Sequence, residues 1–134
     1  MVYLIMSLID LALGWYPVSF GSSEWEFGTI SATMAGLAIP TLALYLILGS
    51  ALARDRTNMA RITGFVMILF AVASAALCAI YLTSVPIALK AVEANPLVHL
   101  GLEKSVIKSL MLFTGYEILF ILGAVRALRR RPPA

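Results

Sequence analysis

Four long apolar segments, separated by shorter polar ones, dominate this sequence. The clearest covers residues 28–53, GTISATMAGLAIPTLALYLILGSALA, and contains no charged residue. A helix rises about 1.5 Å per residue, so this segment exceeds the roughly 30 Å hydrocarbon core of a bilayer. Residues 1–20, 62–83 and 105–125 form three further apolar segments. The pattern predicts an all-α integral membrane protein in which residues 1–134 form a single transmembrane domain with four spans.

The connections between the segments predict how the helices are arranged. Residues 21–27 and 54–61 are short connections, which favour antiparallel neighbours in an up-down four-helix bundle. In such a bundle the first and last helices should also meet. Residues 84–104 are longer and interrupted by polar positions, so we expect an outer loop there.

Prolines mark three positions where a helix is expected to start, stop or bend. Ser84 followed by Pro86 is typical of a helix start, because serine caps and proline suits the first turn. Asn95 and Pro96 together indicate a break. Pro40, near the middle of the second segment, lacks a backbone donor and should kink its helix.

The first apolar segment must be distinguished from a cleaved signal peptide. It has no basic stretch before its apolar run, and it carries Asp10 within that run. We therefore predict a retained helix, with cleavage as the alternative. Trp15 and Tyr16 lie near its far end, as residues of an interfacial aromatic belt would.

Basic residues are distributed unevenly along the chain. The arginines occupy only the second connection and a basic tail, residues 126–134, whereas the lysines lie in or beside the third connection. The positive-inside rule then places both termini in the cytoplasm and the third connection outside. Side chains expected to contact lipid or a partner are Arg126, Arg129, Arg130, Arg131, Trp15 and Trp25.

Composition agrees with a membrane location. Hydrophobic residues make up 61% and charged residues 13% of the chain, against about 45–50% and about 25% in soluble domains. The net charge of +3 comes from arginines at the expected membrane flanks, so we predict no nucleic-acid partner. Cys78 is the single cysteine, which excludes an internal disulfide and a dithiol site.

Small residues recur at a spacing that places them on one helix face. Stripes of this kind let two backbones approach closely in lipid. We expect them to be packing seams inside the bundle, with one stripe facing another subunit as an alternative. The candidate helix-packing or interface positions are Gly28, Ala32, Gly36, Pro40, Ala71, Ala75, Ala79, Gly115 and Gly123.

Two carboxyl groups, Asp10 and Glu117, lie near the centres of the first and last segments. An aspartate at the centre of a spanning helix costs about 2.5–3.5 kcal/mol on insertion scales, and no lysine or arginine lies at matching depth. If the two acids face each other, they can share a proton and form a proton or cation site. The other interpretation is structural: each bonds a neighbouring helix or meets a partner protein.

The remaining candidate site residues lie at the predicted outer face of the membrane. His99 is the single histidine, so it could act only as a lone metal or pigment ligand, and an interfacial histidine without a role is commoner. We predict no metal site and no catalytic residue. Glu24 and Glu26 could pair with Lys104 or Lys108 across this face.

Two segments resemble a known group of proteins. WEFGTI (Trp25–Ile30), the small-residue helix after it, and GLEKSVIKSL (Gly101–Leu110) are similar to small four-helix bacterial membrane proteins known mainly as uncharacterised sequences. The resemblance covers most of the chain and implies a bacterial inner-membrane location without implying an activity. Quinone-linked thiol oxidoreductases fit poorly because they need a cysteine pair. Small multidrug transporters share the size and an acid in the first span, but their other motifs are absent.

Two functions of different classes remain. The first is a non-catalytic accessory or stabilising subunit at the edge of a larger inner-membrane complex, for example photosynthetic or respiratory. The second is a small oligomeric proton- or cation-coupled transporter or channel that uses Asp10 and Glu117. We expect no enzyme activity and no resident cofactor, although a lipid, quinone or pigment could bind at an interface. The expected partners are the lipid bilayer and either a larger complex or further copies of the chain.

Overall fold

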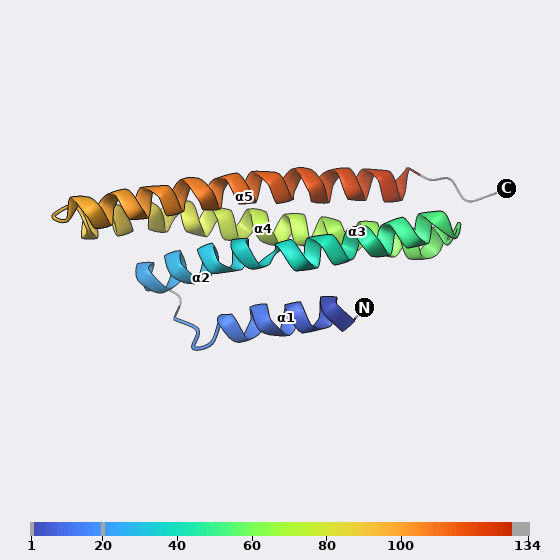
Figure 1. The fold of residues 1–134 in the computed structure, drawn as a ribbon, viewed down its shortest axis with the longest axis horizontal. Helices are drawn as coiled ribbons and strands as arrows, with labels where there is room; N and C mark the ends of the chain where they lie inside the picture. The colour runs from blue at the N-terminus through green and yellow to red at the C-terminus, as the bar shows by residue number, and fades with distance from the viewer. Residues whose placement is uncertain (1, 20, 130–134) are drawn as a thin grey trace.

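The computed structural model describes residues 2–19 and 21–129, and within these ranges its regular elements are helices. In chain order they are α1 (Val2–Gly14), α2 (Ser23–Gly36), α3 (Ala38–Ala53), α4 (Thr57–Ala91) and α5 (Pro96–Leu128). Figure 1 shows an elongated molecule in which the helices run roughly along one axis. The predicted all-α class is confirmed.

Three stretches are long and apolar enough to cross a membrane: Glu24–Ala53, Thr57–Ala91 and Pro96–Arg129. The first of these contains both α2 and α3, which are separated by the single residue Leu37. Each exceeds the roughly 20 residues that a spanning helix needs. The chain therefore fits a small helical membrane protein, as the hydrophobic pattern predicted.

The span predicted over residues 1–20 is shorter in the structure. Helix α1 ends at Gly14, and its 13 residues cover about 20 Å, less than the hydrocarbon core. Glycine is a common helix terminator, and Pro17 disfavours helical backbone at the residue before it. None of the residues of α1 is buried.

The expected contact between the first and last helices is also wrong. In the described part of the chain, α1 packs against α2 and α3 and does not contact α5. Figure 1 shows α1 on the far side of the α2–α3 span from α5. The core consists instead of α4 and α5 packed closely as an antiparallel pair, with α2 and α3 lying along them.

The outer loop predicted over residues 84–104 is mostly helical. Helix α4 continues past Ser84 and contains Pro86, so this serine does not start a helix. The Ser84 hydroxyl points into the bundle, where it donates to Glu26 of α2. The predicted break at Asn95 is confirmed, since its side chain accepts from the Val98 amide and caps α5. Only residues 92–95 separate the two long helices.

Glycines allow α4 and α5 to approach at the end of the bundle near the α3–α4 turn. A Cβ atom built on Gly64 would lie 2.7 Å from the Cβ atom of Ala127. A Cβ atom on Gly123 would collide with the end of the Met67 side chain. The next residue that this Cβ atom would approach is Tyr45, whose hydroxyl would lie 3.3 Å away. Such separations leave no room for a side chain at either glycine. The close packing here is the small-residue contact typical of helices in lipid.

Helix α2 and helix α3 meet at an irregular point beside Pro40, which is fully buried in the third position of α3. Because proline lacks an amide hydrogen, the backbone there loses one helical hydrogen bond. The Thr41 hydroxyl donates to the Leu37 carbonyl at 2.6 Å, which adds a bond across the junction. The interruption occurs where the kink was predicted.

Candidate functional site

The first candidate region is a groove between α1 and α2 that contains Asp10. Its volume is about 240 Å³, and its lining residues are Asp10, Leu11, Leu13, Gly14, Thr29, Ala32, Thr33 and Gly36. Leu11 closes one part of it, because a Cβ atom on Gly36 would lie 2.8 Å from Leu11 Cδ2. The Asp10 side chain is exposed at this groove rather than packed inside the molecule.

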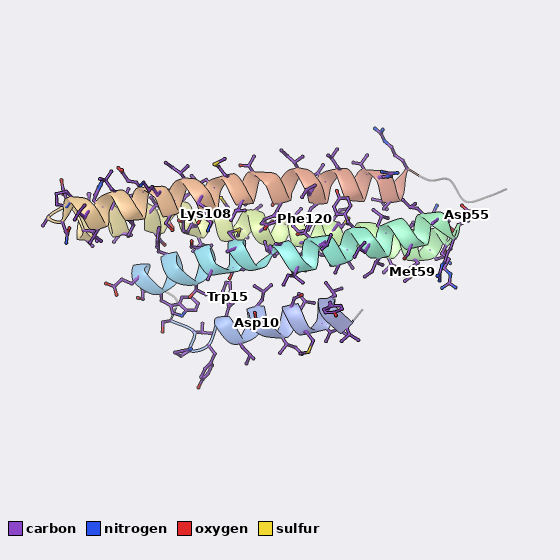
Figure 2. All side chains as sticks on the ribbon, viewed as in Figure 1. Asp10, Trp15, Asp55, Met59, Lys108 and Phe120 are labelled. Carbon is purple, nitrogen blue, oxygen red and sulfur yellow. The ribbon has the colours of Figure 1, made fainter. Side chains whose placement is uncertain are left out.

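Trp15 fastens the end of α1 to α2. Its indole Nε1 donates to the Thr33 hydroxyl at 3.0 Å, and its ring packs edge-on against Trp25 with centroids 5.7 Å apart. The two tryptophans predicted to contact lipid or a partner are thus partly covered by each other. Figure 2 places Asp10 and Trp15 on the same outlying segment of the molecule.

Asp10 is the charged residue of a groove whose other lining residues are leucine, threonine, alanine and glycine. No hydrogen bond or ion pair of Asp10 with the described part of the chain is present. The neighbouring positions Gly28 and Ala32 on α2 are exposed, and a Cβ atom on Gly28 would meet nothing within 4 Å. Ala32 in the groove and Gly28 one turn earlier on α2 therefore form an exposed small-residue patch beside the leucine and threonine side chains that also line the groove.

Glu117 occupies a different part of the molecule. It is half-buried on α5 and accepts a short hydrogen bond from the Ser74 hydroxyl of α4, which also donates to the Ala71 carbonyl. Since α1 and α5 are not in contact, Asp10 and Glu117 do not form a shared site. The structure gives Glu117 a hydroxyl partner that joins two helices.

A line of polar contacts connects α2, α4 and α5 on the side nearer the α4–α5 turn. Ser84 donates to Glu26 Oε2 at 2.7 Å, and the Ser31 and Ser109 hydroxyls are 2.8 Å apart. Glu26 also accepts from the Gly21 amide, so its partners are a serine and the backbone and not one of the two candidate lysines. These hydroxyl groups hold the three helices together within an apolar bundle.

Tyr81 lies beside this line, buried and stacked on Phe27 with ring centroids 5.1 Å apart. Within residues 2–19 and 21–129 its hydroxyl makes no hydrogen bond of regular geometry, although the Ser31 and Ser109 hydroxyls lie near it. A void of about 10 Å³ adjoins it, lined also by Cys78 and Ser109. A space of this size holds about one water molecule.

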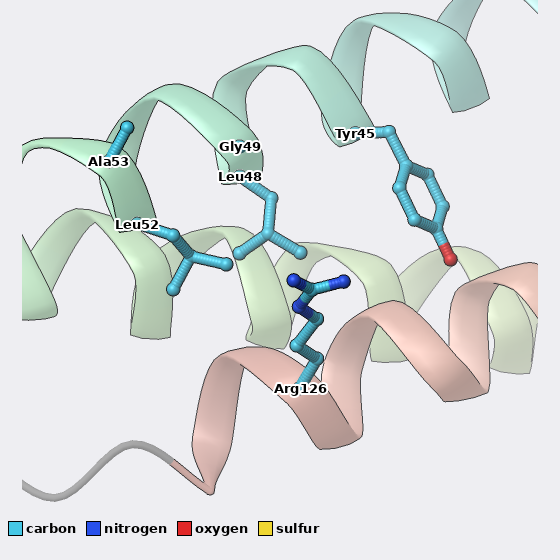
Figure 3. Close-up of a pocket in the computed structure, with 6 residues that line it drawn as sticks. All are labelled: Tyr45, Leu48, Gly49, Leu52, Ala53 and Arg126. Carbon is cyan, nitrogen blue, oxygen red and sulfur yellow. The ribbon is translucent and has the colours of Figure 1, made fainter.

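The second candidate region is a groove between α3 and α5 near the arginine-rich end. Its volume is about 320 Å³, and it is lined by Tyr45, Leu48, Gly49, Leu52, Ala53 and Arg126. Figure 3 shows Arg126 extending from α5 towards α3, with its guanidinium group near Leu48. The Tyr45 hydroxyl donates to the Leu119 carbonyl at 2.6 Å and ties the two helices together.

The other arginines of the predicted basic cluster are partly described. Arg129 follows α5 directly and lines a separate shallow groove with Ile68 and Ile121. Arg130 and Arg131 lie outside the described residues. The α3–α4 turn carries Arg54 and Arg56 at the same end of the molecule as the end of α5.

The small-residue positions divide into packed and open sets. Gly36, Pro40, Ala71 and Gly123 contact neighbouring helices or the core. The exposed set, which faces outward, comprises Gly28, Ala32, Ala75, Ala79 and Gly115. The spacing of small residues along a helix is the same on both kinds of face, so it does not identify which face is packed.

His99 lies in the first turns of α5, where its Nδ1 is 3.5 Å from Glu103 one turn later. Among the described residues, no three or more histidine, cysteine, aspartate or glutamate side chains gather as a metal site would require. His99 is thus part of a helix surface with an acidic neighbour.

Sequence reasoning missed the hydroxyl groups that join the helices, namely those of Ser31, Ser84, Ser109 and Tyr45. Their signal was a hydroxyl within an apolar segment, but a sequence contains many such residues and gives no pairing between them. No family model matches the chain, and comparisons with curated proteins and with solved structures also find no match. The resemblance to small four-helix bacterial membrane proteins stays a prediction.

Proposed function

We propose that this protein is a non-catalytic accessory subunit of a larger membrane complex, and that it binds its partner through the groove between α1 and α2. The observation that carries the proposal is the exposed Asp10 carboxyl group in an apolar groove, without a hydrogen bond or ion pair to the described residues.

The energetics favour a partner that supplies a polar group to Asp10. An ionisable side chain within a membrane helix is costly, and such residues usually pair or face a protein interior. Gly28 and Ala32 leave space for another backbone beside it, as interfaces between membrane helices require. A transmembrane helix with a lysine, arginine or hydroxyl side chain at this depth fits both features.

The peripheral position of α1 agrees with a role in assembly. Its inward face consists of the partly buried Leu4, Ser7 and Leu11, and the rest of it is exposed. A helix with so little contact to its own chain gains most from contact with another. The partner would therefore stabilise α1 as well as neutralise Asp10.

We further propose that the arginine-rich end lies in the cytoplasm of a bacterial cell, with both termini on that side of the inner membrane. The α3–α4 turn and the end of α5 lie together, and the start of α1 points towards the same end (Figure 1). The arginines of the turn and tail support this orientation through the positive-inside rule.

The test is purification from the native membrane in mild detergent, with variants at Asp10. The unaltered chain should copurify with a stoichiometric partner, and a photo-crosslinker at position 32 should join the two. Asp10→Leu should lose the partner, whereas Glu93→Gln, a matched loss of one carboxylate on the exposed α4–α5 connection, should keep it. A chain that is purified alone, or an Asp10→Leu variant that retains the partner, would contradict the proposal.

The transporter alternative now depends on Glu117 alone, because the two acids lie on helices that do not touch. Its Ser74 hydrogen bond would let it hold or release a proton within the α4–α5 pair. Proton flux into liposomes that is lost in Glu117→Gln and unchanged in Asp10→Asn would favour this function over the accessory role.

A further inference from the structure

The groove between α3 and α5 combines one cationic side chain with an apolar floor. Arg126 is its only charged lining residue among those described. Leu52 and Ala53 supply aliphatic surface, and Leu48 is buried beneath the groove. From Tyr45 to Leu52 the groove follows eight residues of α3, over which the helix rises about 10 Å. It lies on the α3–α5 side of the molecule and is separate from the α1–α2 groove of the proposed function.

Two residues keep this groove open. Gly49 has no side chain, and a Cβ atom built there would meet nothing within 4 Å. Tyr45 is held by its hydrogen bond to the Leu119 carbonyl, so its ring forms a fixed wall at the end nearer the membrane centre. The shape is therefore set by the sequence of α3 rather than by a movable side chain.

The charge in the groove lies at the right depth for a lipid headgroup. Arg126 is the first residue after the apolar stretch 105–125. Its guanidinium forms no hydrogen bond or ion pair with the described protein residues. A guanidinium group offers a planar pair of donors that matches two phosphate oxygens.

We propose that this groove is a specific binding site for one anionic phospholipid. The phosphate group accepts hydrogen bonds from Arg126, and the upper part of one acyl chain lies against Leu52 and Ala53 beside Gly49. Basic pockets between membrane helices on the cytoplasmic side are suited to anionic headgroups. The aliphatic floor favours a lipid over free phosphate, and the charge of Arg126 within the groove favours an anionic lipid over a zwitterionic one.

Native mass spectrometry of the full-length protein in detergent tests the proposal, with dioleoyl phosphatidylglycerol and dioleoyl phosphatidylcholine as probes. The unaltered protein should retain one phosphatidylglycerol in preference to phosphatidylcholine. Arg126→Gln should weaken phosphatidylglycerol binding about tenfold, the loss expected for charge-assisted hydrogen bonds. Gly49→Leu should weaken it by filling the groove without changing the charge.

Controls separate this site from general attraction to a charged membrane surface. Arg56→Gln removes the same charge from an exposed turn and should leave binding nearly unchanged. Arg126→Lys keeps the charge without the paired donors and should bind at an intermediate level. Circular dichroism of each variant should show an unchanged helix content.

Three results would overturn the proposal. Equal losses in Arg56→Gln and Arg126→Gln, with none in Gly49→Leu, would mean diffuse electrostatic attraction. Displacement of the lipid by millimolar inorganic phosphate would mean that the site recognises phosphate alone. Phosphatidylcholine binding as tight as that of phosphatidylglycerol would remove the role of charge.

Discussion

The contact between Gly64 and Ala127 allows a quantitative test of the α4–α5 packing. Gly64→Ala would place a methyl group 2.7 Å from the Ala127 Cβ atom, within a rigid contact between two helices. Overpacking of this kind lowers the unfolding free energy by about 1–3 kcal/mol, whereas the higher helix propensity of alanine raises it by about 1 kcal/mol. We therefore expect a net destabilisation between zero and about 2 kcal/mol.

Gly115→Ala is the matched control, because Gly115 is exposed on α5 and a Cβ atom there meets nothing within 4 Å. This variant gains the same helix propensity without a steric clash, so it should stabilise the protein. The propensity contribution cancels between the two variants. Their difference in unfolding free energy should therefore equal the clash itself, about 1–3 kcal/mol.

The assay is equilibrium unfolding in mixed micelles, followed by circular dichroism. Ala127→Gly should restore the space, so the double variant Gly64→Ala/Ala127→Gly should show a favourable coupling of about 1–2 kcal/mol in a double-mutant cycle. Equal shifts for Gly64→Ala and Gly115→Ala, or a coupling near zero, would refute the close approach of the two helices at this point.

Three further predictions concern other parts of the molecule. Trp15→Phe removes the indole hydrogen bond to α2 and should cost about 1 kcal/mol, seen as faster proteolysis of the segment after α1 while the three long helices resist. Glu117→Leu should lower the unfolding midpoint more than Glu117→Gln, because only glutamine can still accept from Ser74; equal midpoints would contradict this hydrogen bond. Cysteines introduced at Asn58 and Glu93 should be labelled from opposite sides of the membrane, and labelling from one side would contradict the α4 span.

Hydropathy predicted the three long spans because their apolar stretches are longer than a bilayer is thick. The same reasoning overestimated the first segment, since it counted apolar residues on both sides of Gly14 and Pro17 as one helix. The break at Asn95 was predictable because an asparagine cap followed by proline is a local signal, readable without the fold. Ser84 and Pro86 formed a similar local signal, but tertiary contact of Ser84 with Glu26 places that serine inside a continuing helix.

The contacts between helices were harder to predict than the positions of the helices in the sequence. Gly115 and Gly123 were both predicted as packing positions on α5, yet Gly123 packs against Met67 and Gly115 faces outward. Asp10 and Glu117 were predicted as a potential pair because both lie within apolar segments, and depth alone carries no information about which helices touch. The pairing of Glu117 with Ser74 depends on the register between α4 and α5, which the four-residue connection 92–95 sets.

The short connection at 92–95 has a practical consequence for handling the protein. Helix α4 continues for eight residues beyond the apolar stretch that ends at Thr83, which raises its tip by about 12 Å. Glu93, Ala94 and Asn95 are exposed at this tip. An epitope tag inserted within residues 92–95 would lengthen the connection that sets the α4–α5 register, whereas a single-residue label at Glu93 would stay accessible to a soluble reagent.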